Sequence, residues 1–201
     1  MQNVTEETSN PFGMRIDGPA VYGYGDANAD FHVVGESPYA HGGANTGVPF
    51  TGSVAGERLQ GVLHAVGLLD APYSDEPTVA NLFLSYAHPG VTEGPPTAAE
   101  FADAERFLDA ELRAINAHIL LPVGDRALRY CLEEHTSLAA KLPVDAAELH
   151  ARQIRGRGFM VVPVRDPVEW ESGDRAQLLG TLRDVLDSDY RQTKGVATTV
   201  G

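Results

Sequence analysis

Four short apolar runs recur along the chain, each bounded by glycine, proline or polar residues. They occupy residues 31–34, 79–84, 118–123 and 159–164. Runs without polar alternation are typical of parallel strands that are covered on both faces. The pattern therefore predicts a central, mostly parallel, four-stranded sheet. A further short strand or an irregular segment is expected near residues 149–154.

Between these runs, apolar residues recur at helical spacing. Helices are predicted over residues 54–68, from 97 to about 115, around 127–132, and over 174–190. The second of these helices opens with Thr97-Ala98-Ala99-Glu100, the spacing of a capping box. Strands that alternate with helices predict the α/β class, here a three-layer α/β/α fold with helices on both faces of the sheet.

The length favours a single domain, which we expect over residues 30–190. Residues 1–29 are predicted to form an irregular segment packed on that domain, and 191–201 a flexible tail. Open parallel sheets bind their ligands beyond the carboxyl ends of the strands. The loops that follow residues 34, 84, 123 and 164 are therefore the expected place for a site.

The chain is strongly acidic, with 28 Asp and Glu against 15 Lys and Arg and a net charge of −13. Only two of the bases are lysines. Such a surface fits a halophilic protein, because high salt screens self-repulsion. Residues 149–165 differ, since they contain no acid and carry His150, Arg152, Arg155, Arg157 and Arg165. This window predicts a strip that faces phosphates, with an ordinary loop of solvated arginines as the alternative.

Cys131 is the only cysteine, so the chain can form neither an internal disulfide nor a four-thiolate iron–sulfur or zinc centre. We expect Cys131 to be a small buried hydrophobe, and we expect no cofactor and no metal. No apolar run is long enough to cross a bilayer, and residues 1–13 lack the pattern of a secretory signal. A cytoplasmic location without membrane contact is predicted.

Five short motifs follow one another along the chain. Residues 23–38 contain a Gly-rich turn, an Ala-Asp pair, an apolar strand and Gly35-Glu36-Ser37-Pro38. Later come Gly-Val-Pro-Phe-Thr-Gly at 47–52, Asn-Leu-Phe-Leu at 81–84, Pro-Thr-Ala-Ala-Glu at 96–100, and a strand with Gly-x-x-Ala at 119–127. Each motif alone is common, but five in order are specific. Together they resemble the uracil-DNA glycosylase superfamily, family 4 most closely, over about residues 23–167.

The resemblance implies a DNA repair enzyme of base excision that hydrolyses the N-glycosidic bond of uracil or another damaged base. It implies DNA as the partner, a base flipped out of the helix, and a monomer. Phe50 would stack on the base, and Asn81 would read its edge, because a carboxamide both donates and accepts. Gly35 and Ser37 would line the same pocket. A core role for Phe50 and a simple turn role for the glycines remain the alternatives.

The catalytic groups depart from the family pattern. The family has a His directly before a Pro after the last strand, whereas this chain has Asp166 there. An ionised carboxylate cannot donate to the departing base, so either Arg165 is expected to replace the donor or burial is expected to keep Asp166 protonated. Between Ser37 and Gly52 the chain has no carboxylate, where family 4 usually has acids, and Tyr39 and His41 stand there instead. The candidates for catalysis are Glu36, His41, Arg165 and Asp166.

These departures leave alternatives open beside an active glycosylase. One is a weakened or inactive glycosylase-like protein that binds a base or nucleic acid. Another is an unrelated metal hydrolase built on His32, His41, His88 or Asp166. Arg152, Arg155 and Arg157 are the candidates for contact with the DNA backbone, and Trp170 lies where relatives carry an apolar wedge. The glycosylase hypothesis places Phe50 and Asn81 in one pocket beside Asp166.

Overall fold

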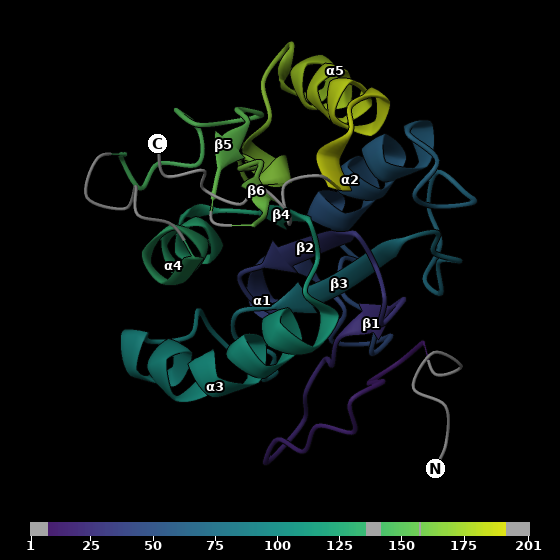
Figure 1. Cartoon of the computed structure of the whole chain (residues 1–201). Coiled ribbons are helices and arrows are strands. Elements are labelled where there is room, and N and C mark those ends of the chain that lie inside the picture. The colour runs from purple at the N-terminus through teal and green to yellow at the C-terminus, as the bar shows by residue number, and fades with distance from the viewer. Residues whose placement is uncertain (1–7, 136–141, 157, 192–201) are drawn as a thin grey trace.

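The computed structural model describes residues 8–135, 142–156 and 158–191. In this part of the chain, a six-stranded sheet has the order β1-β3-β2-β4-β6-β5 (Figure 1). The four inner strands run parallel and are β2 (Phe31–Gly35), β3 (Leu82–Tyr86), β4 (Ile119–Pro122) and β6 (Met160–Val161). The edge strands β1 (Tyr24–Gly25) and β5 (Ile154–Arg155) pair antiparallel. The mostly parallel sheet is confirmed, with two short edge strands beyond the predicted four.

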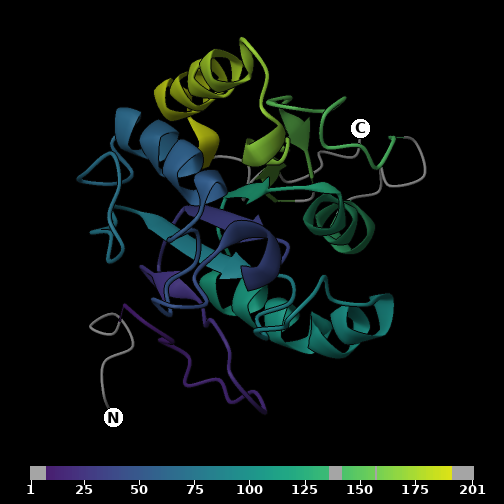
Figure 2. The same cartoon turned by 180° about the vertical axis from the view of Figure 1, so that it is seen from behind.

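Helices cover both faces of this sheet (Figures 1 and 2). On one face lie α2 (Val54–Ala65) and α5 (Asp174–Asp187), and on the other α3 (Ala98–Ile115) and α4 (Asp125–His135). Two short elements, α1 (Pro38–His41) and the 3-10 turn η2 (Pro167–Glu169), lie in the loops after β2 and β6. The predicted three-layer α/β/α architecture is confirmed.

Alternate strand residues fill two separate cores. In β2, Val33 packs into the core with α2 and α5, whereas Val34 packs into the core with α3 and α4. In β3, Leu84 packs into the core with α2 and α5, and Phe83 packs into the core with α3 and α4. Successive strand side chains point to opposite faces, so a strand between two helical layers has to be apolar at every position. This is why the four runs could be recognised in the sequence.

Local predictions for α3 and α4 also hold. The Thr97 side chain accepts the N–H of Glu100, and the Glu100 carboxylate accepts the N–H of Thr97, which completes the capping box. Cys131 in α4 is fully buried, and burial raises the pKa of its thiol to about 12. Among the helices described, none combines the length and the apolar character that crossing a membrane requires.

The strand β3 begins three residues later than its apolar run. Val79 forms an isolated antiparallel bridge with Leu69, and Asn81 has a left-handed backbone with φ 56°, which interrupts the extended chain. The pair Tyr24–Gly25, predicted to be irregular, forms β1. Arg191, predicted to begin a flexible tail, makes an ion pair with Asp30 at 2.7 Å. Two-residue edge strands and single ion pairs leave no periodic pattern in a sequence.

Candidate functional site

Loops from all four parallel strands meet at the carboxyl edge of the sheet. Those after β4 and β6 leave it side by side, because Val123 bridges Val164 and the N–H of Gly124 donates to the Val164 carbonyl at 3.0 Å. The loop between α1 and α2 returns to the same edge, where Phe50 contacts Tyr86. This is where the sequence predicts a site.

Phe50 lies at this edge in a fixed position. Its N–H donates to the Tyr86 hydroxyl at 2.7 Å, and that hydroxyl donates to the Gly42 carbonyl at 3.0 Å. The two rings are 5.3 Å apart between centroids. Gly35 lies beneath them, so close that a Cβ there would be 2.6 Å from Phe50 Cζ. Phe50 is fully buried, and the aromatic floor predicted from the sequence is therefore covered in this structure.

His41 ends α1 and lies beside Phe50. The Ser37 hydroxyl caps α1 by accepting a backbone N–H at 3.4 Å, and the Ser53 hydroxyl donates to the His41 carbonyl at 2.7 Å. The imidazole is nearly parallel to the Phe50 ring, at 19° and 5.5 Å between centroids. Its Nδ1 accepts the N–H of Glu36 at 3.1 Å. These contacts hold a fully buried histidine in one orientation.

Asp166 faces His41 from the loop after β6. Its Oδ2 lies 3.7 Å from His41 Nε2, and its Oδ1 accepts the N–H of Val168 at 2.9 Å. The Asp166 side chain is 32% exposed, whereas that of His41 is 0% exposed. Burial alone would raise the pKa of Asp166, but His41 and the Val168 N–H hold it below its usual value. The prediction of a protonated Asp166 is therefore wrong, and this group is a carboxylate.

Arg165 does not supply the missing donor. Its guanidinium makes ion pairs with Glu171 at 2.9 Å and Asp174 at 3.3 Å, away from Asp166. Neighbouring residues of an extended chain point in opposite directions, which explains this orientation. Trp170 donates from Nε1 to the Arg165 carbonyl at 2.8 Å and packs against the core. The predicted catalytic role of Arg165 and the predicted wedge role of Trp170 are both corrected to structural ones.

Glu36 connects two loops of the edge. Its Oε1 accepts the N–H of Arg126 at 2.9 Å, in the first turn of α4. The same oxygen lies against Gly124, so the carboxylate connects the loop after β2 to the loop after β4. These contacts do not contradict the predicted catalytic role of Glu36, which stays a prediction. The hydroxyl of Ser37 caps α1, so its part in the site is to position His41.

Asn81 lies at the opposite edge of the sheet, directly before the amino end of β3. Its Oδ1 accepts the N–H of Asp30 at 2.6 Å, and its Nδ2 donates to Asp30 Oδ2 at 3.1 Å. The length of β3, about 16 Å at 3.3 Å per residue, separates it from Tyr86 and thus from Phe50. The prediction that Asn81 and Phe50 share a pocket is wrong, and with it the base-reading role of Asn81.

The carboxylate of Asp30 instead forms the centre of a polar cluster at this amino edge. It also lies 2.8 Å from His118 Nδ1 and 2.7 Å from the Arg191 guanidinium. Although burial opposes the shift, hydrogen bonds from Arg191 and Asn81 hold the pKa of Asp30 below its usual value. Asn81 thus helps to fix the starts of β2 and β3 to the C-terminal segment.

Replacing Asn81 with alanine should therefore lower stability. The change removes both hydrogen bonds to Asp30, and the expected loss is about 1–3 kcal/mol in the free energy of unfolding. Urea denaturation of Asn81→Ala beside wild type measures the loss. The control is Asn28→Ala, which replaces an exposed asparagine that makes no hydrogen bond to Asp30. An unchanged urea midpoint for Asn81→Ala would contradict the structural role.

The predicted phosphate strip is only partly available. Arg152 and Arg155 are exposed, and Arg155 lies on the edge strand β5. His150 is buried and accepts the N–H of Arg165 at its Nδ1. Arg157 lies outside the described residues. The two exposed arginines, one just before β5 and one on it, therefore remain candidates for phosphate contact.

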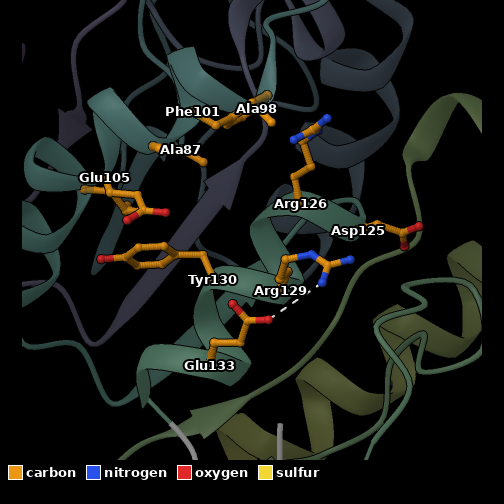
Figure 3. Close-up of a pocket in the computed structure, with 11 residues that line it drawn as sticks. Ala87, Ala98, Phe101, Glu105, Asp125, Arg126, Arg129, Tyr130 and Glu133 are labelled. Atoms are coloured by element: carbon orange, nitrogen blue, oxygen red, sulfur yellow. Dashed lines mark ion pairs between the residues drawn. The ribbon is translucent and has the colours of Figure 1, made fainter. Parts of the chain in front are cut away.

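A cavity of about 530 Å³ lies between α3 and α4 (Figure 3). The Arg126 guanidinium stacks on the Phe101 ring there at 4.5 Å, and Arg129 makes an ion pair with Glu133 at 3.6 Å. Glu105 and Asp125 also line it, so acids outnumber bases. A polyanion is poorly matched to this lining. None of Phe50, His41 and Asp166 lines this cavity, and the candidate site remains at the carboxyl edge.

Two residues of the edge were not predicted from the sequence. Tyr86 fixes the Phe50 backbone, and Arg58 of α2 donates to the carbonyls of Pro167 at 2.6 Å and Val168 at 3.1 Å, holding the loop that carries Asp166. Tyr86 comes two residues after the apolar run at 79–84, and this position at the carboxyl end of a predicted strand could have marked it as a residue of the site. Arg58 could not have been found in this way, because an exposed arginine is ordinary in an amphipathic helix.

The residues of the metal hypothesis do not come together. His32 lies in β2 with its Nε2 2.8 Å from Ser85 Oγ, and His88 packs against Phe101 at 5.6 Å. Within the described ranges, no group of three or more His, Cys, Asp and Glu side chains is arranged to hold a metal ion. Of the four candidates, only His41 and Asp166 face each other.

Comparison with known proteins gives a consistent result. The model of the Uracil DNA glycosylase superfamily matches residues 22–175. A protein of Pyrobaculum aerophilum named Type-5 uracil-DNA glycosylase is 34% identical over 168 residues, 81% of this chain and 72% of that protein. Proteins of the same name from Thermus thermophilus and Mycobacterium leprae are 35% and 33% identical. Those matches cover 56% and 51% of this chain, and 53% and 47% of the relatives' own length.

Proposed function

This chain belongs to the uracil DNA glycosylase superfamily, and we propose that it hydrolyses the N-glycosidic bond of uracil or another damaged base in DNA. We propose that it does so as a monomer on a base flipped out of the helix. The observation that carries this proposal is the meeting of Phe50, His41 and Asp166 at the carboxyl edge. This edge therefore combines an aromatic face, an imidazole and a carboxylate, and it is the edge at which open sheets bind their ligands.

Phe50 is the proposed surface on which the base stacks. Its ring packs against Tyr86 at an angle of 50° and stacks on His41 at 19°. Because the ring is fully buried, a base reaches it only when the covering loop moves. The loop at residues 42–52 contains glycines with positive φ, including Gly43 and Gly47, which supports such a movement.

Val168 is the proposed wedge in place of Trp170. It lies two residues beyond Asp166, and it is 53% exposed at the rim of the site. Arg58 holds its carbonyl at 3.1 Å. An apolar side chain fixed at the rim of the site fits the task of filling the stack that a flipped base leaves.

Arg152 and Arg155 are the proposed contacts to the DNA backbone. Replacing both with alanine should weaken DNA binding several-fold at low salt and lower the slope of log affinity against log salt by about 1 per lost phosphate contact. Fluorescence anisotropy with a labelled oligonucleotide over a salt series measures both quantities. Arg113→Ala, which removes an exposed arginine paired with Asp109 on α3, is the control. A double variant with the wild-type slope would contradict this assignment.

The proposed activity is tested directly with oligonucleotides that carry one uracil. The protein is incubated in high salt with single- and double-stranded versions, and abasic sites are revealed by alkaline cleavage. Uracil-dependent cleavage is expected, with the thymine-containing oligonucleotide intact. If folded protein cleaves none of the deaminated or oxidised bases but still binds DNA, the glycosylase activity is excluded and a binding function takes its place.

A further inference from the structure

His41 carries a buried ring nitrogen that forms no hydrogen bond, although it faces the carboxylate of Asp166. Its Nδ1 accepts the backbone N–H of Glu36, so in the neutral ring the proton is on Nε2. This Nε2 is inaccessible to solvent and forms no hydrogen bond. Its nearest acceptor, Asp166 Oδ2, is 3.7 Å away, beyond hydrogen-bond distance. A buried donor without an acceptor is costly, and a site that keeps one is suited to a ligand that supplies the acceptor.

The direction of this N–H fits a base that stacks on Phe50. A ring N–H lies in the plane of its ring, and the His41 ring is within 19° of the Phe50 plane. A base stacked on Phe50 would also be nearly parallel to that plane. The His41 donor therefore points in a direction nearly parallel to the plane of such a base.

The neighbouring groups cannot take this task. Asp166 is ionised and accepts hydrogen bonds only. The Tyr86 hydroxyl already donates to the Gly42 carbonyl. His88, also at this edge, packs against Phe101 in the core beneath α3. At the described part of the edge, His41 is the side chain that combines burial, an open donor and contact with Phe50.

We propose that His41 and Asp166 divide the catalytic work in exchanged positions, the imidazole of the first loop acting on the base and the carboxylate of the last loop acting on the sugar. The inference rests on the glycosylase function proposed above. The Nε2–H of His41 donates to the oxygen beside the glycosidic nitrogen. The substrate class is then a pyrimidine such as uracil, because it has a carbonyl at that place.

The bond changes follow from these positions. The C1′–N1 bond breaks, and its electron pair leaves with the base as an anion shared between nitrogen and oxygen. The hydrogen bond from His41 stabilises that anion. Water attacks C1′, Asp166 accepts a proton from this water, and the C1′–OH bond forms. That proton then passes through solvent to the departed base, so the sum is hydrolysis to free base and an abasic sugar.

Single-turnover excision by His41→Phe tests the proposal. Phenylalanine keeps a ring against Phe50 but has no donor, and the expected loss of rate on uracil is about a hundred- to a thousandfold. On 5-fluorouracil, whose anion needs less stabilisation, the loss should be about tenfold smaller. His88→Phe is the matched control and should keep the wild-type rate on both bases. A His41→Phe variant that is as fast as wild type on uracil, or equally impaired on both bases, overturns the proposal.

The outcome also separates this inference from the proposed function. If wild type excises neither base, the glycosylase function itself fails, whereas active wild type with an insensitive His41 removes only the inference. Should His41→Phe fail to fold, proton NMR of the wild-type protein takes its place. The Nε2–H resonance of His41 should move downfield on addition of an oligonucleotide with an uncleavable 2′-fluoro deoxyuridine. An unmoved resonance with the oligonucleotide bound overturns the proposal.

Discussion

Replacing Gly35 with alanine is expected to slow base excision about a hundredfold and to lower the melting temperature by roughly 5–10 °C. A Cβ at this position would lie 2.6 Å from Phe50 Cζ, 2.7 Å from Tyr86 Cε1 and 2.8 Å from His41 Nδ1. All three distances are shorter than a carbon atom tolerates, so at least one ring has to move.

The Tyr86 and His41 rings cannot move without straining a hydrogen bond, and the Phe50 ring is packed between them. The Tyr86 hydroxyl is bonded to the Phe50 N–H and the Gly42 carbonyl, and His41 Nδ1 is bonded to the Glu36 N–H. A shift of about 1 Å in catalytic groups typically costs a hundredfold in rate. The site and the local core therefore fail together.

Thermal melting and single-turnover excision of Gly35→Ala measure the two effects. Gly61→Ala is the matched control, because Gly61 lies within α2 and a Cβ there meets no atom within 4 Å. The control should gain about 0.5–1 kcal/mol of stability, as alanine does in a helix, and keep full activity. A Gly35→Ala variant that melts and cleaves like wild type would show that the packing around Phe50 is looser than the structure implies.

The sequence was informative where one physical requirement acts on every residue of a segment. Strands buried on both faces must be apolar throughout, and β2 and β4 are found within a residue of their predicted bounds. The capping box of α3 needs only Thr97 and Glu100 at fixed spacing, and it forms. The rule for ligand sites in open sheets then located the edge where Phe50 and His41 lie.

The position of Asn81 could not be predicted in this way. A polar residue inside an apolar run was taken to belong to a site, but its left-handed backbone places it before the strand instead of within it. Its hydrogen bonds to Asp30, far away in the chain, cannot be found from local pattern.

The contact between His41 and Asp166 was likewise beyond sequence reasoning. Both residues were candidates, but their mutual distance depends on how the loops after β2 and β6 leave the sheet. The capped α1 turns His41 inward, while Asp166 caps η2 with its other oxygen. Each residue was noted as a departure from the family pattern, and together they form one pair of complementary groups.

Replacing Glu111 with glutamine is expected to make the protein more stable at alkaline pH, by up to about 4 kcal/mol. Glu111 lies within α3 and is buried. Burial raises the pKa of this carboxyl to about 8, although hydrogen bonds from Ser85 and the Gly23 N–H act in the opposite direction. Ser85 Oγ in turn lies 2.8 Å from His32 Nε2, so the carboxyl ends a buried polar chain.

The sign of the effect follows from proton binding. The folded protein holds the Glu111 proton up to a pH of about 8, whereas the unfolded chain releases it near the ordinary value of 4.5. The contribution of Glu111 to stability is therefore full below pH 4.5, falls as the pH rises between 4.5 and 8, and stays low above 8. Glutamine keeps the shape and the hydrogen-bonding capacity without a proton to lose.

Urea denaturation of Glu111→Gln and wild type from pH 4 to 9 measures this difference directly, because other titrating groups cancel between the two proteins. The difference should be small at pH 4 and grow until about pH 8. Glu100→Gln on the same helix is a control of opposite sign, since hydrogen bonds from Thr97 lower the pKa of Glu100 and its contribution is lost on acidification. A Glu111→Gln difference that is flat across the range would mean that water reaches this carboxyl, and that the core beneath α3 is not closed around it.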